Sequence, residues 1–218
     1  IILGFVGIKH LGITRAIGIW VPPLIIISAL WGLIYFGEAR DLGPQKLATT
    51  ILALLLLILA AILIVSTSKG DKKLGNVKLG IIASLIIGVF HGSFFVPMRM
   101  TTLSTSAAML PMSLGLVATT SAVMIFQKLK LNHGLTANSR MLLGGLILGF
   151  GNFSALITIQ LLGVAQGFPL TQLAIVVNTL WGVFVFKEVT TAKGKIMIAI
   201  GIALALTGAI LLNSAKPS

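Results

Sequence analysis

Polar side chains that could bind a solute lie within long apolar segments. Thr171, Ala174, Asn178 and Trp181 follow one another at helical spacing, which predicts one stripe along a helix. An amide offers a hydroxyl group both a donor and an acceptor, and an indole offers a flat apolar face. The stripe is therefore typical of a site for a neutral hydroxylated solute such as a sugar. An interhelical Asn hydrogen bond with an interfacial Trp belt is the structural alternative.

One titratable side chain, His91, is predicted to lie well inside a membrane span. Polar groups at membrane depth are costly and usually face a cavity or another helix. An imidazole titrates close to physiological pH, so His91 is a candidate for proton coupling or for a sugar hydrogen bond. A bond to a neighbouring backbone carbonyl is the structural alternative. Coupling to protons or another ion stays open, and no cofactor or metal is expected.

Small residues recur at four-residue spacing. Gly145 and Gly149 form a Gly-x3-Gly pair, which predicts close helix packing. Asn152, on the same face, is either a packing hydrogen bond or a cavity residue. A second ladder, predicted to press its helix against a neighbour, consists of Gly80, Ser84, Gly88 and Gly92.

Trp20 precedes Pro22-Pro23, a pair that predicts a broken or bent helix. Bent helices expose backbone carbonyls and often line transport sites, so Trp20 is another candidate solute contact. A simple kink is the alternative.

The composition requires a membrane. Of 218 residues, 57% are hydrophobic and 9% are charged, whereas soluble domains carry about 25% charged residues. The excess of 16 Lys and Arg over 4 Asp and Glu does not indicate a nucleic-acid partner, because these charges lie between apolar segments. There is no phosphate-binding loop, metal-ligand spacing or catalytic triad, so the sequence predicts no enzyme.

Apolar segments predict an all-α polytopic membrane bundle with seven full spans and a partial one. The segment Leu47–Thr67 has few features and is predicted to face lipid or a second copy, which makes a homodimer one alternative. The segments are Ile1–Leu11, Thr14–Gly37, Leu47–Thr67, Leu79–Met98, Ala107–Leu129, Met141–Leu162, Pro169–Lys187 and Gly194–Asn213.

A nine-residue stretch occurs twice. Leu30–Glu38 and Leu180–Glu188 share Leu-Trp-Gly, a Phe and the final Glu. The repeat places Ser28 and Trp31 opposite Asn178 and Trp181, so both join the candidate solute contacts. Leu11-Gly12-Ile13 similarly matches Leu162-Gly163-Val164.

The duplication predicts an inverted repeat of five plus five helices. We expect the first two and a half helices, about 70 residues, to be missing from the front. The expected organisation is residues 1–67 as the rest of the first repeat, 68–78 as a cytoplasmic linker, 79–213 as the second repeat and 214–218 as a tail.

The distribution of Lys and Arg predicts the orientation. Loops on one side hold 12 of the 16, and the other side holds Arg40, Lys46, Arg99 and Lys216. The richer side is expected to be cytoplasmic. Glu188 then lies at the cytoplasmic face and Glu38 at the outer face, where both are expected to be helix-end or gate residues. Arg99, at the outer end, is a gate or an anchor.

The five-plus-five pattern, with Leu-Gly near the start and Trp-Gly-x5-Glu at the end of each fourth helix, resembles the drug/metabolite transporter superfamily (EamA-like). The stretch Gly92–Arg99 is similar to the Gly-Ser-x3-Pro-x-Lys/Arg stretch of its sugar-porter branch, which contains glucose/ribose and rhamnose uptake proteins. The resemblance covers essentially the whole chain. It implies a ten-helix transporter that holds its substrate between two bundles.

We therefore expect a secondary transporter in the plasma membrane that moves a monosaccharide by alternating access. One alternative is an exporter of amino acids or other metabolites. Another is a receptor or scaffold that binds without transport.

Overall fold

The computed structural model describes residues 2–67, 75–101, 104–126, 134–185 and 191–215. This part is helical and contains no strand, and six of its helices are long and apolar enough to cross a membrane. The all-α polytopic class is thereby confirmed. The elements are α1 (Ile2–Leu11), α2 (Ile13–Leu30), the π-helical turn η1 (Trp31–Tyr35), α3 (Glu38–Thr67), α4 (Val77–Gly92), α5 (Val96–Arg99), α6 (Thr105–Phe126), α7 (Leu135–Thr171), α8 (Ala174–Phe184) and α9 (Ala192–Ser214).

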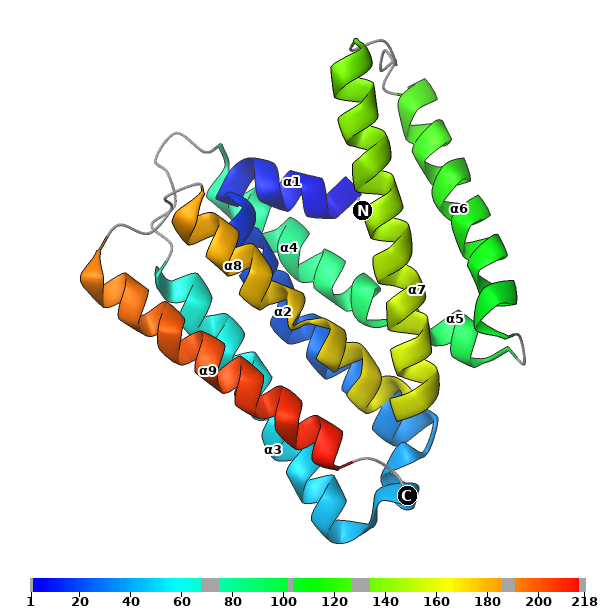
Figure 1. Cartoon of the computed structure of the whole chain (residues 1–218), viewed down its shortest axis with the longest axis vertical. Helices are drawn as coiled ribbons and strands as arrows, with labels where there is room; N and C mark the ends of the chain where they lie inside the picture. The colour runs from blue at the N-terminus through cyan, green and yellow to red at the C-terminus, as the bar shows by residue number, and fades with distance from the viewer. Residues whose placement is uncertain (1, 68–74, 102–103, 127–133, 186–190, 216–218) are drawn as a thin grey trace.

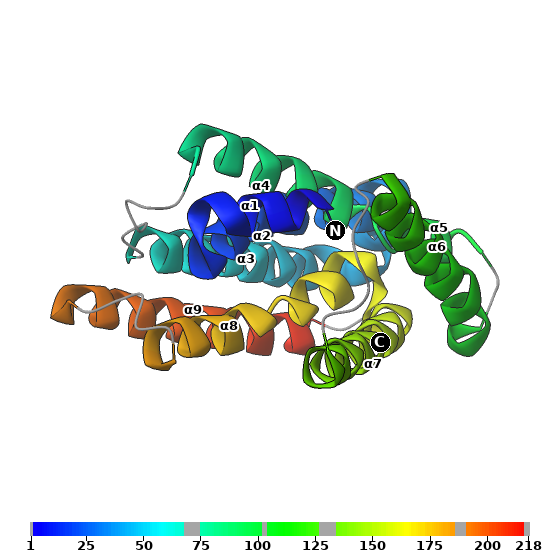
Figure 2. The same ribbon diagram turned by 90° about the horizontal axis from the view of Figure 1, so that it is seen from above.

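The helices α3 and α9 lie along one edge of the molecule, and α2 and α8 lie between them and α4 (Figure 1). The pairs with the most extensive contacts are α3 with α9 and α2 with α4, and α2 also packs on α3. Seen from above, α4 and α1 lie on one side of α2 and α3, while α8 and α9 lie on the other (Figure 2). The hairpin of α6 and α7 extends at the side, and α6 contacts mainly α7.

The helix α3 was expected to face lipid or a second copy over Leu47–Thr67. Instead, one of its faces is buried, mainly because it packs along α9. Gly208 lies so close to this face that an added Cβ would sit 3.0 Å from the carbonyl oxygen of Ala53. The expectation therefore holds at most for the other face, where Leu52, Leu55, Leu59 and Ile62 are exposed.

The small-residue ladder on α4 is confirmed as a packing surface. An added Cβ at Gly88 would lie 2.5 Å from the backbone oxygen of Trp20, and one at Gly92 would lie 2.8 Å from that of Leu24. Side chains at these positions would push α4 away from α2. The absence of side chains thus sets the distance between the two helices.

The other small-residue motif behaves differently, and the expected close packing at Gly145 and Gly149 is wrong for this chain. Apart from the backbone of α7 itself, no described residue lies within 4 Å of a Cβ at either glycine. Asn152 is half-buried.

Breaks in the helices lie at glycines and not at the proline pair. The helix α2 runs through Pro22 and Pro23 without a break, so of the expected broken or bent helix the break is wrong, and the bend stays a prediction. Gly43 interrupts α3, and Gly163 interrupts α7, both with positive φ. Gly12 starts α2 with φ 81° and ψ 167°, and Gly163 has nearly the same conformation, φ 78° and ψ 176°. The two glycines that correspond in the duplication therefore share one backbone conformation.

Candidate functional site

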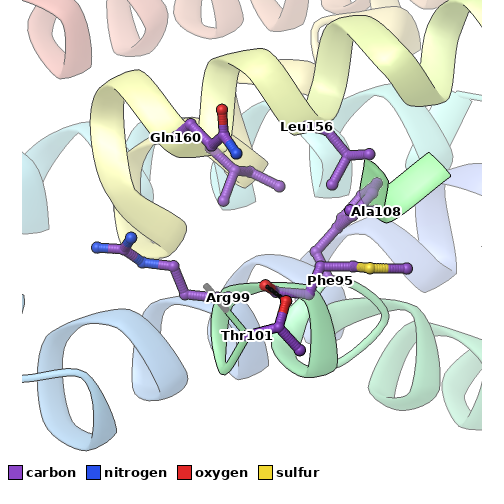
Figure 3. A pocket seen from close by; sticks show the side chains of 8 residues that line it. Phe95, Arg99, Thr101, Ala108, Leu156 and Gln160 are labelled. Atoms are coloured by element: carbon purple, nitrogen blue, oxygen red, sulfur yellow. Dashed lines mark hydrogen bonds between the residues drawn. The ribbon is translucent and has the colours of Figure 1, made fainter. Parts of the chain in front are cut away.

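A pocket of about 240 Å³ lies between α5, α6 and α7. Gln160 and Leu156 reach into it from α7, opposite Phe95, Arg99 and Thr101 (Figure 3). Its polar groups are one guanidinium, one amide and one hydroxyl. The remaining lining is apolar, and consists of Phe95, Met98, Ala108, Leu156 and Ile159.

The amide of Gln160 is oriented by α6. The hydroxyl of Thr105, in the first turn of α6, donates to Oε1 of Gln160. This bond leaves the amide nitrogen of Gln160 to donate to a solute. Sequence reasoning missed Gln160, because it lies near the end of a span and belongs to no repeated motif.

The wall of this pocket continues into a cluster of aromatic rings. Phe95, buried in the turn between α4 and α5, has its ring centroid 4.9 Å from that of Phe168. The Phe168 ring lies 5.7 Å from His91. Beyond it, the Trp20 ring lies 6.5 Å from His91, and all of these contacts are edge-to-face. A solute in the pocket is thus one aromatic ring away from the His91 cluster.

His91 lies at the centre of the aromatic cluster. Its ring also contacts Phe94 at 5.8 Å. Among the residues that the structure describes, none forms a hydrogen bond with its ring nitrogens. The predicted bond to a neighbouring carbonyl is therefore not formed, and the imidazole contacts only aromatic rings among the described side chains.

Trp31 and Ser28, predicted from the first copy of the repeated stretch, occupy different environments. The indole of Trp31 donates a hydrogen bond of 2.9 Å to the hydroxyl of Ser93. Trp31 and Ser93 also line an open apolar groove of about 510 Å³ beside α2 and α4. Ser28 is fully buried, and its hydroxyl donates to the carbonyl of Ile25. Neither residue lines the pocket of Gln160.

The predicted stripe in the second half is interrupted, since α7 ends at Thr171 and α8 begins only at Ala174. The expected continuous helix over these positions is therefore wrong. The hydroxyl of Thr171 donates to the carbonyl of Phe168 and accepts from the Gln172 amide. Asn178 is half-buried, and Trp181 is 55% exposed.

The structure thus places Arg99 in the pocket. It places Trp20 and His91 in the aromatic cluster beyond Phe95. It places Asn152, Asn178 and Trp181 elsewhere. Their roles as solute contacts stay predictions. Glu188, the predicted cytoplasmic gate, lies outside the described residues.

Glu38 begins α3 and reaches across to α7. Its carboxylate oxygens accept hydrogen bonds of 2.7 and 2.9 Å from the backbone amides of Val164 and Ala165. These are the first amides after the break at Gly163. A carboxylate at a helix N-terminus is stabilised by the free amides and the helix dipole. Glu38 therefore caps a helix segment that is distant in sequence.

A buried amide, not predicted from sequence, directly follows the two amides that Glu38 caps. Gln166 is 1% exposed, and its Nε2 donates to Thr50 on α3 and to the carbonyl of Ala215 after α9. Its Oε1 is buried and has no partner among the residues that the structure describes. Gln166 thus ties three helices together at the same end of the bundle as Glu38.

Metal ligation is absent from the described part of the chain, where no three His, Asp or Glu residues are close enough to hold an ion. The pocket and the cluster offer hydrogen bonds, aromatic faces and one guanidinium. They can bind a small polar molecule.

Comparison with known proteins gives the family. A family model described as sugar transport protein matches residues 2–215. The chain is 32% identical over 213 residues to the glucose uptake protein GlcU of Bacillus subtilis (strain 168). This alignment covers 96% of this chain and 72% of the relative. It is 29% identical over 214 residues to the probable glucose uptake protein GlcU of Priestia megaterium, covering 96% of this chain and 73% of the relative.

A putative sugar uptake protein of Listeria monocytogenes is 27% identical over 214 residues, covering 97% of this chain and 73% of the relative. No solved structure matches the chain significantly. Six helices of membrane-spanning length in the described part, together with these relatives, show a multi-pass integral protein of the plasma membrane. The chain belongs to the sugar transport protein family.

Proposed function

We propose that this protein is a secondary transporter that moves a monosaccharide across the plasma membrane by alternating access. The observation that carries the proposal is the position of Phe95, which lines the pocket of Gln160 and also contacts Phe168 in the cluster around His91. The wall of the pocket is therefore packed directly against the aromatic cluster that holds His91. The relatives named as glucose or sugar uptake proteins support the same assignment.

The chemistry of the pocket suits a sugar. Amide and hydroxyl groups match the donors and acceptors of a sugar, and aromatic rings match its apolar faces. The pocket, at about 240 Å³, lies below the range of roughly 300–1,000 Å³ that is usual for drug-sized ligands. A small solute is therefore favoured.

An inverted repeat is part of the proposal. It is supported by Gly12 and Gly163, which correspond in the duplicated sequence and share one positive-φ conformation. Each starts a helix segment, as the broken helices of inverted-repeat transporters do. In that architecture, alternating access follows from rocking one repeat against the other around a central site.

Export of amino acids or other metabolites is the second candidate, and the guanidinium of Arg99 in the pocket favours it for solutes that carry a carboxylate. Broken-helix transporters also bind substrate carboxylates at the N-terminus of a half-helix. Here that terminus is already occupied by the carboxylate of Glu38. This occupancy favours a neutral solute.

Counterflow in proteoliposomes decides between these candidates. Vesicles are loaded with unlabelled solute from a panel of hexoses, pentoses and amino acids, and entry of the labelled solute is followed. We expect exchange of a monosaccharide, which persists in Arg99→Gln. Exchange of amino acids alone, abolished by Arg99→Gln, would establish the exporter. Binding without exchange would establish the receptor or scaffold.

A further inference from the structure

The contact between Glu38 and α7 uses both oxygens of one carboxylate. Oε1 accepts from the amide of Val164 at 2.7 Å, and Oε2 accepts from that of Ala165 at 2.9 Å. Hydrogen bonds to an ionised acceptor are about twice as strong as neutral ones. Glu38 and the amides lie more than 120 residues apart, so this cap joins two distant segments.

The contact also requires a glycine at residue 163. A Cβ at Gly163 would lie 2.6 Å from Oε1 of Glu38 and 2.7 Å from Oε2. The φ of 78° at Gly163 is itself unfavourable for other residues. Gly163 thus supplies both the break in α7 and the space that the carboxylate fills.

The helix segment Val164–Thr171 that follows is bounded by a joint at each end. Gly163 precedes it, and the turn before Ala174 follows it. Along its length, the segment carries Gln166, which is bonded to α3, and Phe168, which contacts His91 and Phe95. The position of the segment therefore sets the position of Phe168, which packs against Phe95 in the wall of the pocket.

We propose that Glu38 is a positioning residue for this site. Its carboxylate latches the segment Val164–Thr171 onto the start of α3 and so holds Phe168 against His91 and Phe95. Without the latch, the segment shifts at its two joints and the aromatic wall of the site is less ordered. This proposal rests on the proposed function, because the site it positions is the sugar site.

Two variants break the latch from opposite sides. Glu38→Gln keeps the size of the side chain but loses the charge and one acceptor. Gly163→Ala displaces the carboxylate with a methyl group. The matched controls are Asp41→Asn, which removes an exposed acid from the same turn, and Gly43→Ala, which strains another positive-φ break with nothing within 4 Å.

Sugar counterflow is measured as a half-saturation concentration and a maximal rate per folded protein. We expect a rise of roughly 10-fold in half-saturation for Glu38→Gln and for Gly163→Ala, because the displaced Phe168 leaves the pocket wall misplaced for the sugar; this rise corresponds to about 1.4 kcal/mol. The maximal rate should change by less than about 2-fold, and the double variant should resemble either single variant because both remove one contact. The controls should leave half-saturation unchanged.

The proposal is overturned if half-saturation is unchanged in either folded variant. It is also overturned if only the maximal rate falls, because a contact that serves stability alone lowers the amount of active protein and leaves sugar affinity unchanged. Amide hydrogen exchange in the wild-type protein tests the latch without variants. Val164 and Ala165 should exchange slowly, and more slowly still with sugar; fast exchange at both amides contradicts the latch. If the wild-type protein shows no sugar counterflow, the proposed function fails. Even then, slow hydrogen exchange at the amides of Val164 and Ala165 that Glu38→Gln accelerates would demonstrate the latch.

Discussion

The indole nitrogen of Trp31 donates a hydrogen bond of 2.9 Å to the hydroxyl of Ser93, although the two residues are 62 positions apart. Trp31 begins the π-helical turn after α2, and Ser93 caps the end of α4. The Trp of the repeated Leu-Trp-Gly stretch and the Ser of the Gly-Ser-x3-Pro stretch are therefore partners in one contact. Two motifs that are separate in sequence together fix the end of the α2–α4 pair.

Ser93→Ala tests this contact. The substitution leaves the part-buried indole of Trp31 without its acceptor, so we expect a loss of about 0.5–1.5 kcal/mol in the free energy of unfolding. Reversible unfolding of the purified protein in detergent measures the loss. Trp31→Phe combined with Ser93→Ala should cost less than the sum of the two single variants.

Ser139→Ala is the matched control, because the hydroxyl of Ser139 is exposed and donates only to the carbonyl of Thr136 in its own helix. It should change stability by less than about 0.5 kcal/mol. Equal effects of Ser93→Ala and Ser139→Ala, or additive effects in the double variant, would show that the Trp31–Ser93 bond contributes nothing.

Much of the fold follows from local signals in the sequence. Apolar runs of membrane length predict the spans, and the ladder that includes Gly88 and Gly92 predicts the close contact of α4 with α2. Proline was a poorer guide. Pro22 and Pro23 are accommodated inside α2, whereas the breaks occur at Gly12 and Gly163, where φ is positive.

The site was less accessible from sequence, because its contacts join distant segments. His91 stands out as an isolated ionisable residue in an apolar run, so it could be predicted. Gln160, Gln166 and Phe168 carry no such signal. Their importance depends on which helices meet, and only the tertiary structure shows that Phe95 reaches Phe168 and that Glu38 reaches Val164.

Gly88→Ala tests the close packing of α4 on α2. The new methyl group would lie 2.5 Å from the backbone oxygen of Trp20 and 2.6 Å from Cγ of Pro23, so the helices must separate. We expect a loss of about 1–3 kcal/mol, as in other overpacked interiors. Thermal unfolding in detergent measures it.

The control for Gly88→Ala is Gly149→Ala, a helical glycine with nothing within 4 Å. Here the gain in helix propensity should leave stability unchanged or raise it by up to about 1 kcal/mol. If Gly88→Ala were as stable as Gly149→Ala, the α2–α4 contact would be looser than the structure indicates.

Gln160→Leu tests the pocket. The substitution keeps a side chain of similar size but removes the amide that Thr105 orients, so a sugar loses a hydrogen-bond partner. We expect half-saturation for sugar counterflow to rise about 10-fold, corresponding to roughly 1.4 kcal/mol. Gln45→Leu, at an exposed position near the start of α3, should leave half-saturation unchanged. Equal values for both variants would place the sugar elsewhere.

His91→Gln separates proton coupling from solute binding. Glutamine keeps hydrogen-bonding capacity but cannot take up a proton near neutral pH. If His91 carries the proton, the variant should lose the stimulation of net uptake by an inward proton gradient, while sugar counterflow at equal pH continues. His10→Gln is the control, because His10 bonds through Nδ1 to the amide of Asn76, away from the cluster; it should keep the stimulation. An unchanged gradient response in His91→Gln would eliminate His91 as the coupling group. Loss of both the gradient response and sugar counterflow would assign His91 to sugar binding.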